Sequence, residues 1–328
     1  MLTEPICFRP ILKEYLWGGR RLGTELGKPI GVGPHYAESW EVVDHGADQS
    51  VVADGPLAGK TLHELVAEHG EALFGRHHPR PQFPLLLKFL DAQRTLSVQV
   101  HPNDAQAARL DPPDLGKTEA WVVLAAEPGA KIYAGLKPGV DRATLERELA
   151  AGTCDNCLHR FEPQPGDCVL LEARTVHALG AGLLIAEIQQ SSNTTYRLFD
   201  WNRVDVDGKP RELHVEQSLD TIDYQRGPVS PRAPQPTDRP HVEQLVACDK
   251  FLLDRWRLDG AEPCGGDERF HILSIVDGAA TVTCEGQRHK LVRGGTVLLP
   301  AACPPVTVAP QRAGSSPTPA TLLDMYLP

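Results

Sequence analysis

The chain has 328 residues and a mass of 35.8 kDa, enough for one large domain or two of moderate size. Hydrophobic residues make up 41% and charged residues 23%, an ordinary globular composition that excludes a wholly disordered chain. The formal charge is −10, from 33 basic and 43 acidic residues, and the basic residues are scattered. This distribution argues against a surface for nucleic acid or an anionic membrane.

The sequence carries no pattern of a secreted or membrane protein. No apolar stretch approaches the roughly 20 residues of a membrane span, and the N-terminus lacks a signal-peptide pattern. The eight cysteines are too sparse for a disulfide framework, so we expect reduced thiols and a cytoplasmic protein. Cys154 and Cys157 form a CxxC, for which a structural role is favoured over redox chemistry or half of a zinc site.

The N-terminal third predicts short strands and one helical segment. Residues 1–58 hold short apolar runs broken by Gly and Pro, with 19–35 expected to form a loop. In residues 61–75, Leu and Val recur at helical spacing before a glycine, which predicts one or two short helices. Residues 85–92 then read as a buried strand.

The next part of the chain predicts strands with a few short helices. Asn103 is placed to cap a helix, and Gly152 is placed to end another. We expect helices at 103–110, 141–150 and 212–222, and strands at 96–101, 120–125, 131–134, 168–173, 183–190 and 194–201.

The C-terminal part reads as a second β unit behind a linker. Residues 227–240 contain five prolines, the strongest linker signal in the chain. Beyond them short strands alternate with Gly turns, and GGTVLLP (294–300) aligns with GDCVLLE (166–172) as an internal repeat. That alignment puts Pro305 where His177 stands, and Gln287 to His289 are expected in a polar turn. We therefore expect the second unit to lack metal ligands.

Strand 96–101 carries the first candidate metal ligands. Its apolar residues alternate with Ser97, Gln99 and His101, so these three side chains point the same way. Glu119 begins the next apolar run, and His177 follows a later strand. Two imidazoles, a carboxylate and an amide oxygen would form an open, catalytic type of metal site. Spacing alone leaves open whether the two histidines are ligands or hydrogen-bonded residues at strand ends.

Several motifs together resemble the type I mannose-6-phosphate isomerases in their short bacterial form. They are QVHP (99–102), GKTEAW (116–121), the Gly-Asp turn ten residues before His177, and AEIQQSSNTTYRLFDWNR (186–203). KEYLWGG, FPLLLKFLDA and RELHVEQSL extend the resemblance over about residues 5–225, and it is looser beyond.

The resemblance implies a mainly β bicupin, in which two tandem jelly-roll barrels carry a few short covering helices. It predicts a catalytic cupin domain with N-terminal strands over 1–226, a linker over 227–240, and a degenerate second barrel over 241–328. It further implies one divalent metal ion, usually zinc, in the first barrel. By the resemblance its ligands are Gln99, His101, Glu119 and His177.

The implied reaction interconverts mannose 6-phosphate and fructose 6-phosphate through an enediol. The resemblance places Arg197 across the substrate pocket, with Glu187 and Lys117 pointing into it. A carboxylate in an apolar strand is expected to have a raised pKa, so Glu187 is our candidate carbon base and Lys117 its partner for a hydroxyl proton. Arg197, helped by Ser97, is expected to bind the phosphate. Structural pairing of Arg197 with Asp200 or Glu187 is the competing interpretation.

Two other functions remain open on the sequence. A metal-dependent cupin dioxygenase is disfavoured by Gln99 in a ligand position. A non-catalytic, sugar-binding or regulatory bicupin is favoured only by Arg174, which replaces a turn glycine usual in the family. If position 174 needs a positive φ, the arginine strains the turn before His177. We expect a small phosphorylated sugar as the partner, no nucleic acid or membrane, and a monomer or weak homodimer.

Overall fold

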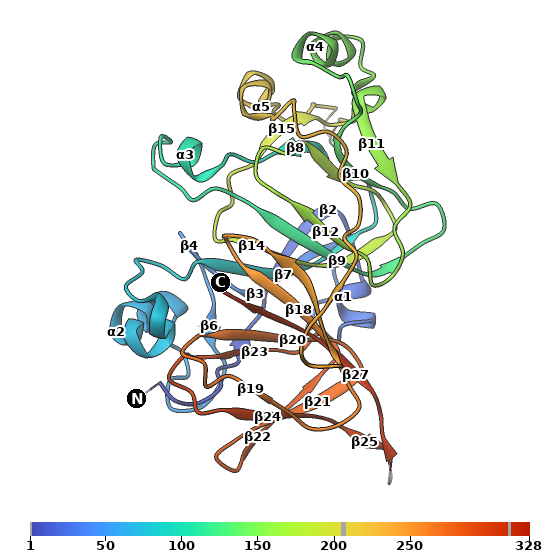
Figure 1. Cartoon of the computed structure of the whole chain (residues 1–328). Coiled ribbons are helices and arrows are strands. Elements are labelled where there is room, and N and C mark those ends of the chain that lie inside the picture. Colours follow the sequence, from blue (N-terminus) through green and yellow to red (C-terminus); the bar gives the residue numbers. More distant parts are fainter. Residues whose placement is uncertain (1, 205–207, 314–315) are drawn as a thin grey trace. The chain divides into compact units, whose positions relative to one another are not determined.

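The computed structural model describes residues 2–204, 208–313 and 316–328, and the chain is mainly β (Figure 1). Its residues group into two compact units. Residues 14–19 and 90–232 form the first, which we name the central unit. Residues 1–13, 20–89 and 233–328 form the second, named the terminal unit because it holds both chain ends.

The units divide the chain differently from the predicted tandem domains. The predicted linker, 227–240, contains the point between residues 232 and 233 where the central unit ends. Residues 20–89, which belong to the predicted catalytic domain over 1–226, group with the C-terminal strands in this division. Hydrogen bonds join these residues to the C-terminal part: the N–H groups of Ala301 and Ala302 donate to the carbonyls of Leu73 and Ala72, and Lys28 Nζ donates to the carbonyl of Gly294.

The central unit consists of eight strands and three short helices that lie wholly within it. The strands are β8 (Val98–Val100), β9 (Glu119–Ala126), β10 (Ile132–Leu136), β11 (Leu158–Phe161), β12 (Cys168–Leu171), β13 (His177–Leu179), β14 (Leu183–Gln190) and β15 (Tyr196–Phe199). The α-helices are α3 (Asp104–Ala107), α4 (Arg142–Ala150) and α5 (Val215–Thr221), with a 3-10 turn at Cys154–Cys157. Five strands form an antiparallel sheet in the order β11-β10-β13-β8-β15, and β9 pairs with β12 and β14.

The terminal unit holds the remaining elements. Its N-terminal part has β1 (Phe8–Arg9), α1 (Arg21–Thr24), β3 (Tyr36–Val42), β4 (Asp44–His45), β5 (Asp48–Gln49), β6 (Val51–Val52), α2 (Leu62–Phe74) and a 3-10 turn at Gly75–His77. Two strands, β2 (Ile11–Gly19) and β7 (Leu85–Ala92), contain residues of both units.

The C-terminal part of the terminal unit is built from short antiparallel strands. They are β16 (Gln235–Pro236), β17 (Val242–Ala247), β18 (Leu252–Leu258), β19 (Glu262–Cys264), β20 (His271–Asp277), β21 (Ala279–Cys284), β22 (Gln287–Val292), β23 (Thr296–Leu299), β24 (Val306–Pro310), β25 (Arg312–Ala313), β26 (Ser316–Pro317) and β27 (Ala320–Tyr326). One sheet has the order β16-β17-β18-β27-β20-β23, and another has the order β19-β24-β21-β22.

Most predicted elements are confirmed, and two local predictions are wrong. The predicted loop 19–35 contains the short helix α1. Residues 287–289 lie in β22 rather than in a turn, since Gln287 opposes Cys284 and His289 opposes Val282. The turn is shorter than predicted because Glu285 and Gly286 both adopt positive φ, which suits a two-residue hairpin loop.

Local side-chain chemistry explains where the helices begin and end. Thr61 and Asn103 each accept a hydrogen bond from the third helical residue, whose side chain bonds back, forming a capping box on α2 and on α3. Asp141 caps α4 through the N–H of Thr144. Gly152 adopts φ +73° just after α4, as the predicted helix stop requires.

Each unit has its own apolar core. In the central unit, side chains of β8, β13 and β15 pack with α4 and α5, and those of β9, β12 and β14 pack with β10. In the terminal unit, side chains of β18, β20, β21, β23, β24 and β27 form one cluster. Cys154 and Cys157 lie buried in the central core as free thiols, and burial raises the pKa of both. These features favour the structural interpretation of the CxxC.

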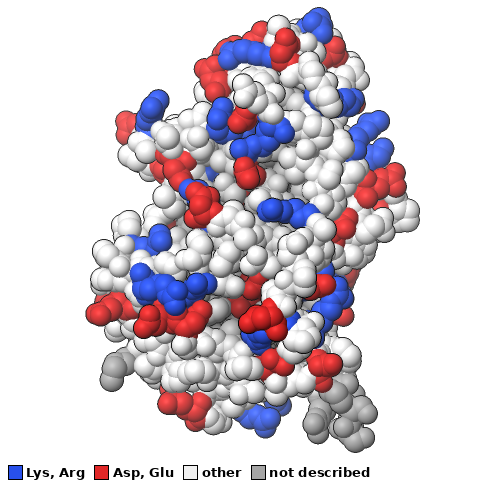
Figure 2. Space-filling view, in the orientation of Figure 1, with Lys and Arg blue, Asp and Glu red and all other residues white. Residues whose placement is uncertain are grey.

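The surface matches the scattered charge of the sequence. On the face shown in Figure 2, Lys and Arg side chains are interspersed with Asp and Glu. Among the described residues, no helix has both the length and the apolar character needed to cross a membrane.

Candidate metal centre

Three neighbouring strands align polar side chains on one face of the central unit. In the antiparallel register, Gln99 of β8 lies opposite His177 of β13 on one side and opposite Arg197 of β15 on the other. Directly opposed residues point to the same face of a sheet. The strand pairing therefore brings residues 99, 177 and 197 into one row, although they are distant in sequence.

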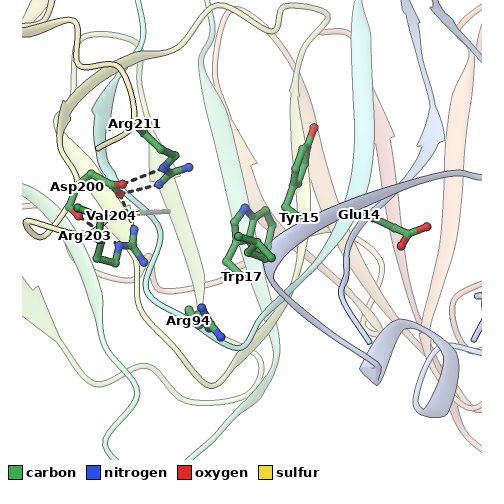
Figure 3. A pocket seen from close by; sticks show the side chains of 9 residues that line it. Glu14, Tyr15, Trp17, Arg94, Asp200, Arg203, Val204 and Arg211 are labelled. Carbon is green, nitrogen blue, oxygen red and sulfur yellow. Dashed lines mark hydrogen bonds and ion pairs between the residues drawn. The ribbon is translucent and has the colours of Figure 1, made fainter. Parts of the chain in front are cut away.

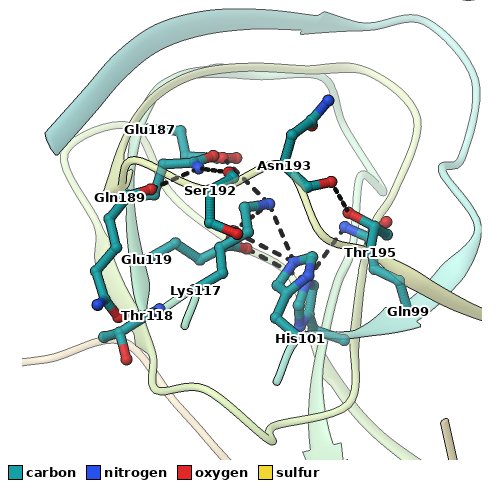
Figure 4. Close-up of polar contacts among 12 residues, drawn as sticks. Gln99, His101, Lys117, Thr118, Glu119, Glu187, Gln189, Ser192, Asn193 and Thr195 are labelled. Carbon is teal, nitrogen blue, oxygen red and sulfur yellow. Dashed lines mark hydrogen bonds and ion pairs between the residues drawn. The ribbon is translucent and has the colours of Figure 1, made fainter. Parts of the chain in front are cut away.

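His101, Glu119 and His177 form the centre of this group (Figure 4). Nε2 of His101 lies 3.4 Å from Glu119 Oε2, and Nε2 of His177 lies 3.2 Å from Glu119 Oε1. All three residues are at most 1% exposed. Gln99 joins them, because its amide nitrogen lies 3.2 Å from His177 Nε2. The structure thus brings all four predicted ligand residues together.

Backbone carbonyls fix the orientation of both imidazoles. Nδ1 of His101 lies 2.9 Å from the carbonyl oxygen of Thr194, and Nδ1 of His177 lies 2.9 Å from that of Thr175. Each Nδ1–H can donate to its carbonyl, which leaves the Nε2 lone pair facing Glu119. Metal-binding histidines are commonly held in this way. Asp114 supports the loop by accepting hydrogen bonds from the hydroxyls of Ser192 and Thr194.

Glu119 is ionised although its side chain is buried. Burial by itself would raise its pKa, but the Lys117 ammonium and the imidazoles of His101 and His177 hold the pKa well below its usual value. Lys117 Nζ lies 3.0 Å from Glu119 Oε2 and 3.1 Å from His101 Nε2. Burial, and then the same ammonium, lower the pKa of His101 to about 3. The site therefore contains a neutral imidazole and an ionised carboxylate.

These donors fit a divalent cation. Within the described part of the chain, neither carboxylate oxygen of Glu119 has a hydrogen-bond partner of good geometry, although the residue is fully buried. The Nε2 atoms of His101 and His177 face those oxygens, and the Gln99 amide presents its oxygen when it is turned over. Nitrogen and oxygen donors of this kind suit zinc or a similar metal. The central unit thus carries a candidate metal-binding group.

Glu187 and Lys117 lie beside the group. Glu187 Oε2 accepts a 2.9 Å hydrogen bond from the indole N–H of Trp121, and its Oε1 lies 3.9 Å from Lys117 Nζ. Glu187 and Trp121 are direct partners across β14 and β9. The sequence reasoning missed Trp121, although its place two residues after Glu119 in a strand put both on one face.

Arg197 contacts Ser97 rather than the competing partners predicted for it. Its Nε donates to Ser97 Oγ at 3.3 Å, and its Nη1 donates to the carbonyl of Glu212 at 2.8 Å. Asp200 is instead paired with Arg203 and Arg211. Burial lowers the pKa of Arg197, and the nearby Arg211 adds to the effect.

The turn before His177 has a strained backbone, because position 174 does need the positive φ on which the predicted strain depended. Arg174 adopts φ +74°, the left-handed region that favours glycine. Its N–H donates to the carbonyl of His101 at 2.7 Å, which ties the turn to the metal-binding group. Its Nε donates to the carbonyl of Thr221, and Nη1 lies 3.5 Å from Asp223. These side-chain contacts offset part of the strain.

Two further polar clusters were not predicted. In the central unit a cavity of about 340 Å³ is lined by Tyr15, Trp17, Arg94, Arg203 and Arg211, beside the paired Asp200 (Figure 3). In the terminal unit Cys264, His271 and Asp324 form a second group with metal-binding atoms. No motif marks either cluster in the sequence, because its members are far apart along the chain.

The comparisons with known proteins agree on the kind of enzyme that this chain resembles. Residues 7–119 match the family model described as phosphomannose isomerase type I, catalytic domain, and residues 241–312 match that of a mannose-6-phosphate isomerase cupin domain. The chain is 37% identical over 312 residues to mannose-6-phosphate isomerase ManA of Bacillus subtilis, covering 92% of this chain and 94% of that protein.

Two further matches agree. A mannose-6-phosphate isomerase of Streptococcus mutans is 35% identical over 299 residues, covering 91% of this chain and 93% of that protein. The crystal structure of the mannose 6-phosphate isomerase from Bacillus subtilis superposes with a TM-score of 0.88 at 31% identity. That match covers 98% of this chain and 99% of the other.

Proposed function

The chain belongs to the type I phosphomannose isomerases, and from this we propose that it interconverts mannose 6-phosphate and fructose 6-phosphate. The observation that carries the proposal is the buried group of His101, Glu119 and His177 with Glu187 beside it. We also propose the finer architecture of the family, two tandem jelly-roll barrels, and a cytoplasmic location.

The proposed metal ion is zinc, held by Gln99, His101, Glu119 and His177. When bound, the metal supplies a positive charge that polarises the sugar carbonyl and stabilises negative charge on oxygen during the proton transfer. The carbonyls of Thr175 and Thr194 support this role by holding the Nε2 atoms of the two histidines toward Glu119.

Glu187 is the proposed base that moves a proton between C2 and C1. The indole N–H of Trp121 holds one carboxylate oxygen, so the other, Oε1, is directed toward Lys117. One base on one face of the enediol can take the proton from C2 and return it to C1. Lys117 is the proposed partner for the hydroxyl proton, since its ammonium lies near both Glu119 and Glu187.

Arg197 and Ser97 are the proposed phosphate-binding residues. The register of β15 and β8 puts Arg197 on the same face as Gln99, and its hydrogen bond to Ser97 groups two donors there. A guanidinium offers a fixed fork of donors suited to phosphate oxygens. The phosphate would therefore lie along β8 and β15, at one side of the metal-binding group.

A coupled assay tests the proposal. The purified chain is stripped with a chelator, reloaded separately with zinc, cobalt or manganese, and supplied with mannose 6-phosphate while fructose 6-phosphate is detected. We expect turnover that the chelator abolishes and a metal restores. Absence of turnover with all three metals would refute the function and favour a non-catalytic sugar-binding protein. Oxygen uptake that depends on iron would favour a dioxygenase.

A further inference from the structure

The terminal unit contains a second buried group of metal-binding side chains. Cys264 ends β19, His271 begins β20 and Asp324 lies in β27, and these residues are 4%, 5% and 2% exposed. Their candidate ligand atoms all lie within 4.8 Å of one another. Nδ1 of His271 is 2.9 Å from Asp324 Oδ1, and Cys264 Sγ is 4.0 Å from Asp324 Oδ2. Sulfur, nitrogen and oxygen donors in this combination suit zinc.

His271 is oriented as a ligand would be. Its Nε2 lies 3.2 Å from Asp267 Oδ1, so Nε2–H can donate to that carboxylate, and its Nδ1, which shares a proton with Asp324 when no metal is bound, is the nitrogen left to bind a metal. An outer carboxylate that accepts the second N–H of a histidine is a recurring support of zinc ligands. His101 and His177 in the central unit are held on the same principle by carbonyl oxygens.

An independent observation is a second buried carboxylate at this place, beside the pair of Asp324 and His271. Asp254 of β18 lies directly opposite Asp324 of β27, and the two residues are only 7% and 2% exposed. Tyr326 donates to Asp254 Oδ2 at 2.7 Å, but Asp254 Oδ1 has no hydrogen-bond partner among the described residues. Two opposed carboxylates that are both buried repel each other, and a divalent cation between their strands offsets that cost.

The group is accessible through a cavity. Cys264, His271, Asp324, Asp254 and Tyr326 all line a cavity of about 620 Å³ in the terminal unit. A metal site needs an entry path as well as ligands, and this cavity provides one.

The position of the group in the sheet repeats that of the first site. Glu119 lies opposite Leu171 at the end of β12, and His271 lies opposite Leu299 at the end of β23. Leu171 and Leu299 are aligned by the repeated phrases GDCVLLE and GGTVLLP. Asp324 likewise corresponds to Glu187. Glu187 lies opposite Trp121, two residues after Glu119, and Asp324 lies opposite Leu273, two residues after His271.

We propose that the terminal unit binds one Zn²⁺ through Cys264 Sγ, His271 Nδ1 and the Asp324 carboxylate, with its remaining coordination position toward the cavity. Asp267 orients His271. Binding releases two protons to solvent, one from the Cys264 thiol and one from Nδ1 of His271. The proposal departs from the expectation that residues 241–328 lack metal ligands. That expectation came from the alignment of the repeat, in which Pro305 stands at the position of His177. The proposed ligand set does not use position 305 and takes its sulfur ligand from Cys264.

Metal counting tests the proposal independently of the isomerase assay. The full chain is stripped with a chelator, reloaded with excess zinc, freed of unbound metal by gel filtration, and analysed by mass spectrometry of the metal. We expect two zinc ions per wild-type chain, one in Cys264→Ala and one in His101→Gln. A wild-type chain with one zinc ion that Cys264→Ala retains would show that His271 is merely an imidazolium between Asp267 and Asp324, and would overturn the proposal.

Cobalt gives a test in which wild-type protein alone can refute the proposal. The first site has no sulfur ligand, so a thiolate-to-cobalt absorption band in the near ultraviolet of wild-type protein reports Cys264. We expect the band in wild type and in the control Cys284→Ala, another buried cysteine of the same unit, and its loss in Cys264→Ala. Absence of the band from wild type, its survival in Cys264→Ala or its loss in Cys284→Ala would overturn the proposal.

Discussion

The strained turn at Arg174 gives a prediction whose magnitude follows from the structure. A side chain with a Cβ at φ +74° costs about 1–2 kcal/mol relative to glycine. Arg174 recovers part of this through the hydrogen bond from Nε to the carbonyl of Thr221, worth about 1 kcal/mol. The partly exposed ion pair with Asp223 adds about 0–1 kcal/mol.

Two substitutions separate the strain from the contacts. Arg174→Ala keeps the strain and loses the contacts, so it should lower the free energy of unfolding by about 1–2 kcal/mol. Arg174→Gly loses the contacts but also the strain, so it should lie within about 1 kcal/mol of wild type. The Gly variant should therefore be the more stable of the two by about 1–2 kcal/mol.

Urea unfolding followed by tryptophan fluorescence measures these differences, with the slope compared between variants to check that only stability has changed. The N–H of residue 174 still reaches the carbonyl of His101 in both variants, so both should keep the bound metal. An Ala variant as stable as the Gly variant would refute the argument, because it would mean that the backbone at this turn carries no strain.

Four further predictions concern the site and its surroundings. Glu187→Gln should bind metal normally and lose about 10²–10⁴-fold in kcat, as measured by the coupled assay and metal counting, and turnover within tenfold of wild type would remove Glu187 from the base role. Arg197→Lys should lower kcat/KM for the sugar phosphate by roughly ten- to hundredfold and Ser97→Ala by less, whereas unchanged kinetics in both would relocate the phosphate site. Chelation should lower the thermal midpoint of wild type by more than that of Glu119→Gln, which can lose only the proposed metal of the terminal unit, and an equal drop in both would place the stabilising metal away from Glu119. Burial raises the pKa of Asp200, but Arg211 and Arg203 lower it overall, so its ion pairs stabilise the fold at neutral pH and are lost as the pH falls through the lowered pKa. Asp200→Asn should therefore be less stable than wild type in denaturant titrations at neutral pH, with the gap closing below about pH 4, and a gap that stays constant down to pH 2 or so would contradict this.

Much of the candidate site could be predicted because its residues lie in short motifs. Alternation along β8 put Gln99 and His101 on one face, and the apolar run after Glu119 marked β9. Capping residues such as Asn103 and Asp141 marked helix starts, since a side chain bonded to a nearby N–H depends only on local sequence.

Other features could not be predicted, since they depend on contacts between strands that are far apart in the sequence. The Trp121 indole donates to a carboxylate 66 residues away. The grouping of residues 20–89 with the C-terminal strands depends on backbone bonds such as that from Ala301 N–H to the carbonyl of Leu73. The turn at Glu285 and Gly286 escaped prediction because a glutamate at positive φ is rare.

By itself, the sequence determined the family, the residue types of the metal-binding group and the positions of most strands, because motifs and alternation are local properties. Only the tertiary structure decided which atoms face one another. It placed Nε2 of two histidines against Glu119, directed Arg197 to Ser97, and brought Cys264, His271 and Asp324 together. Register between strands fixes such meetings, and register depends on the packing of the whole sheet.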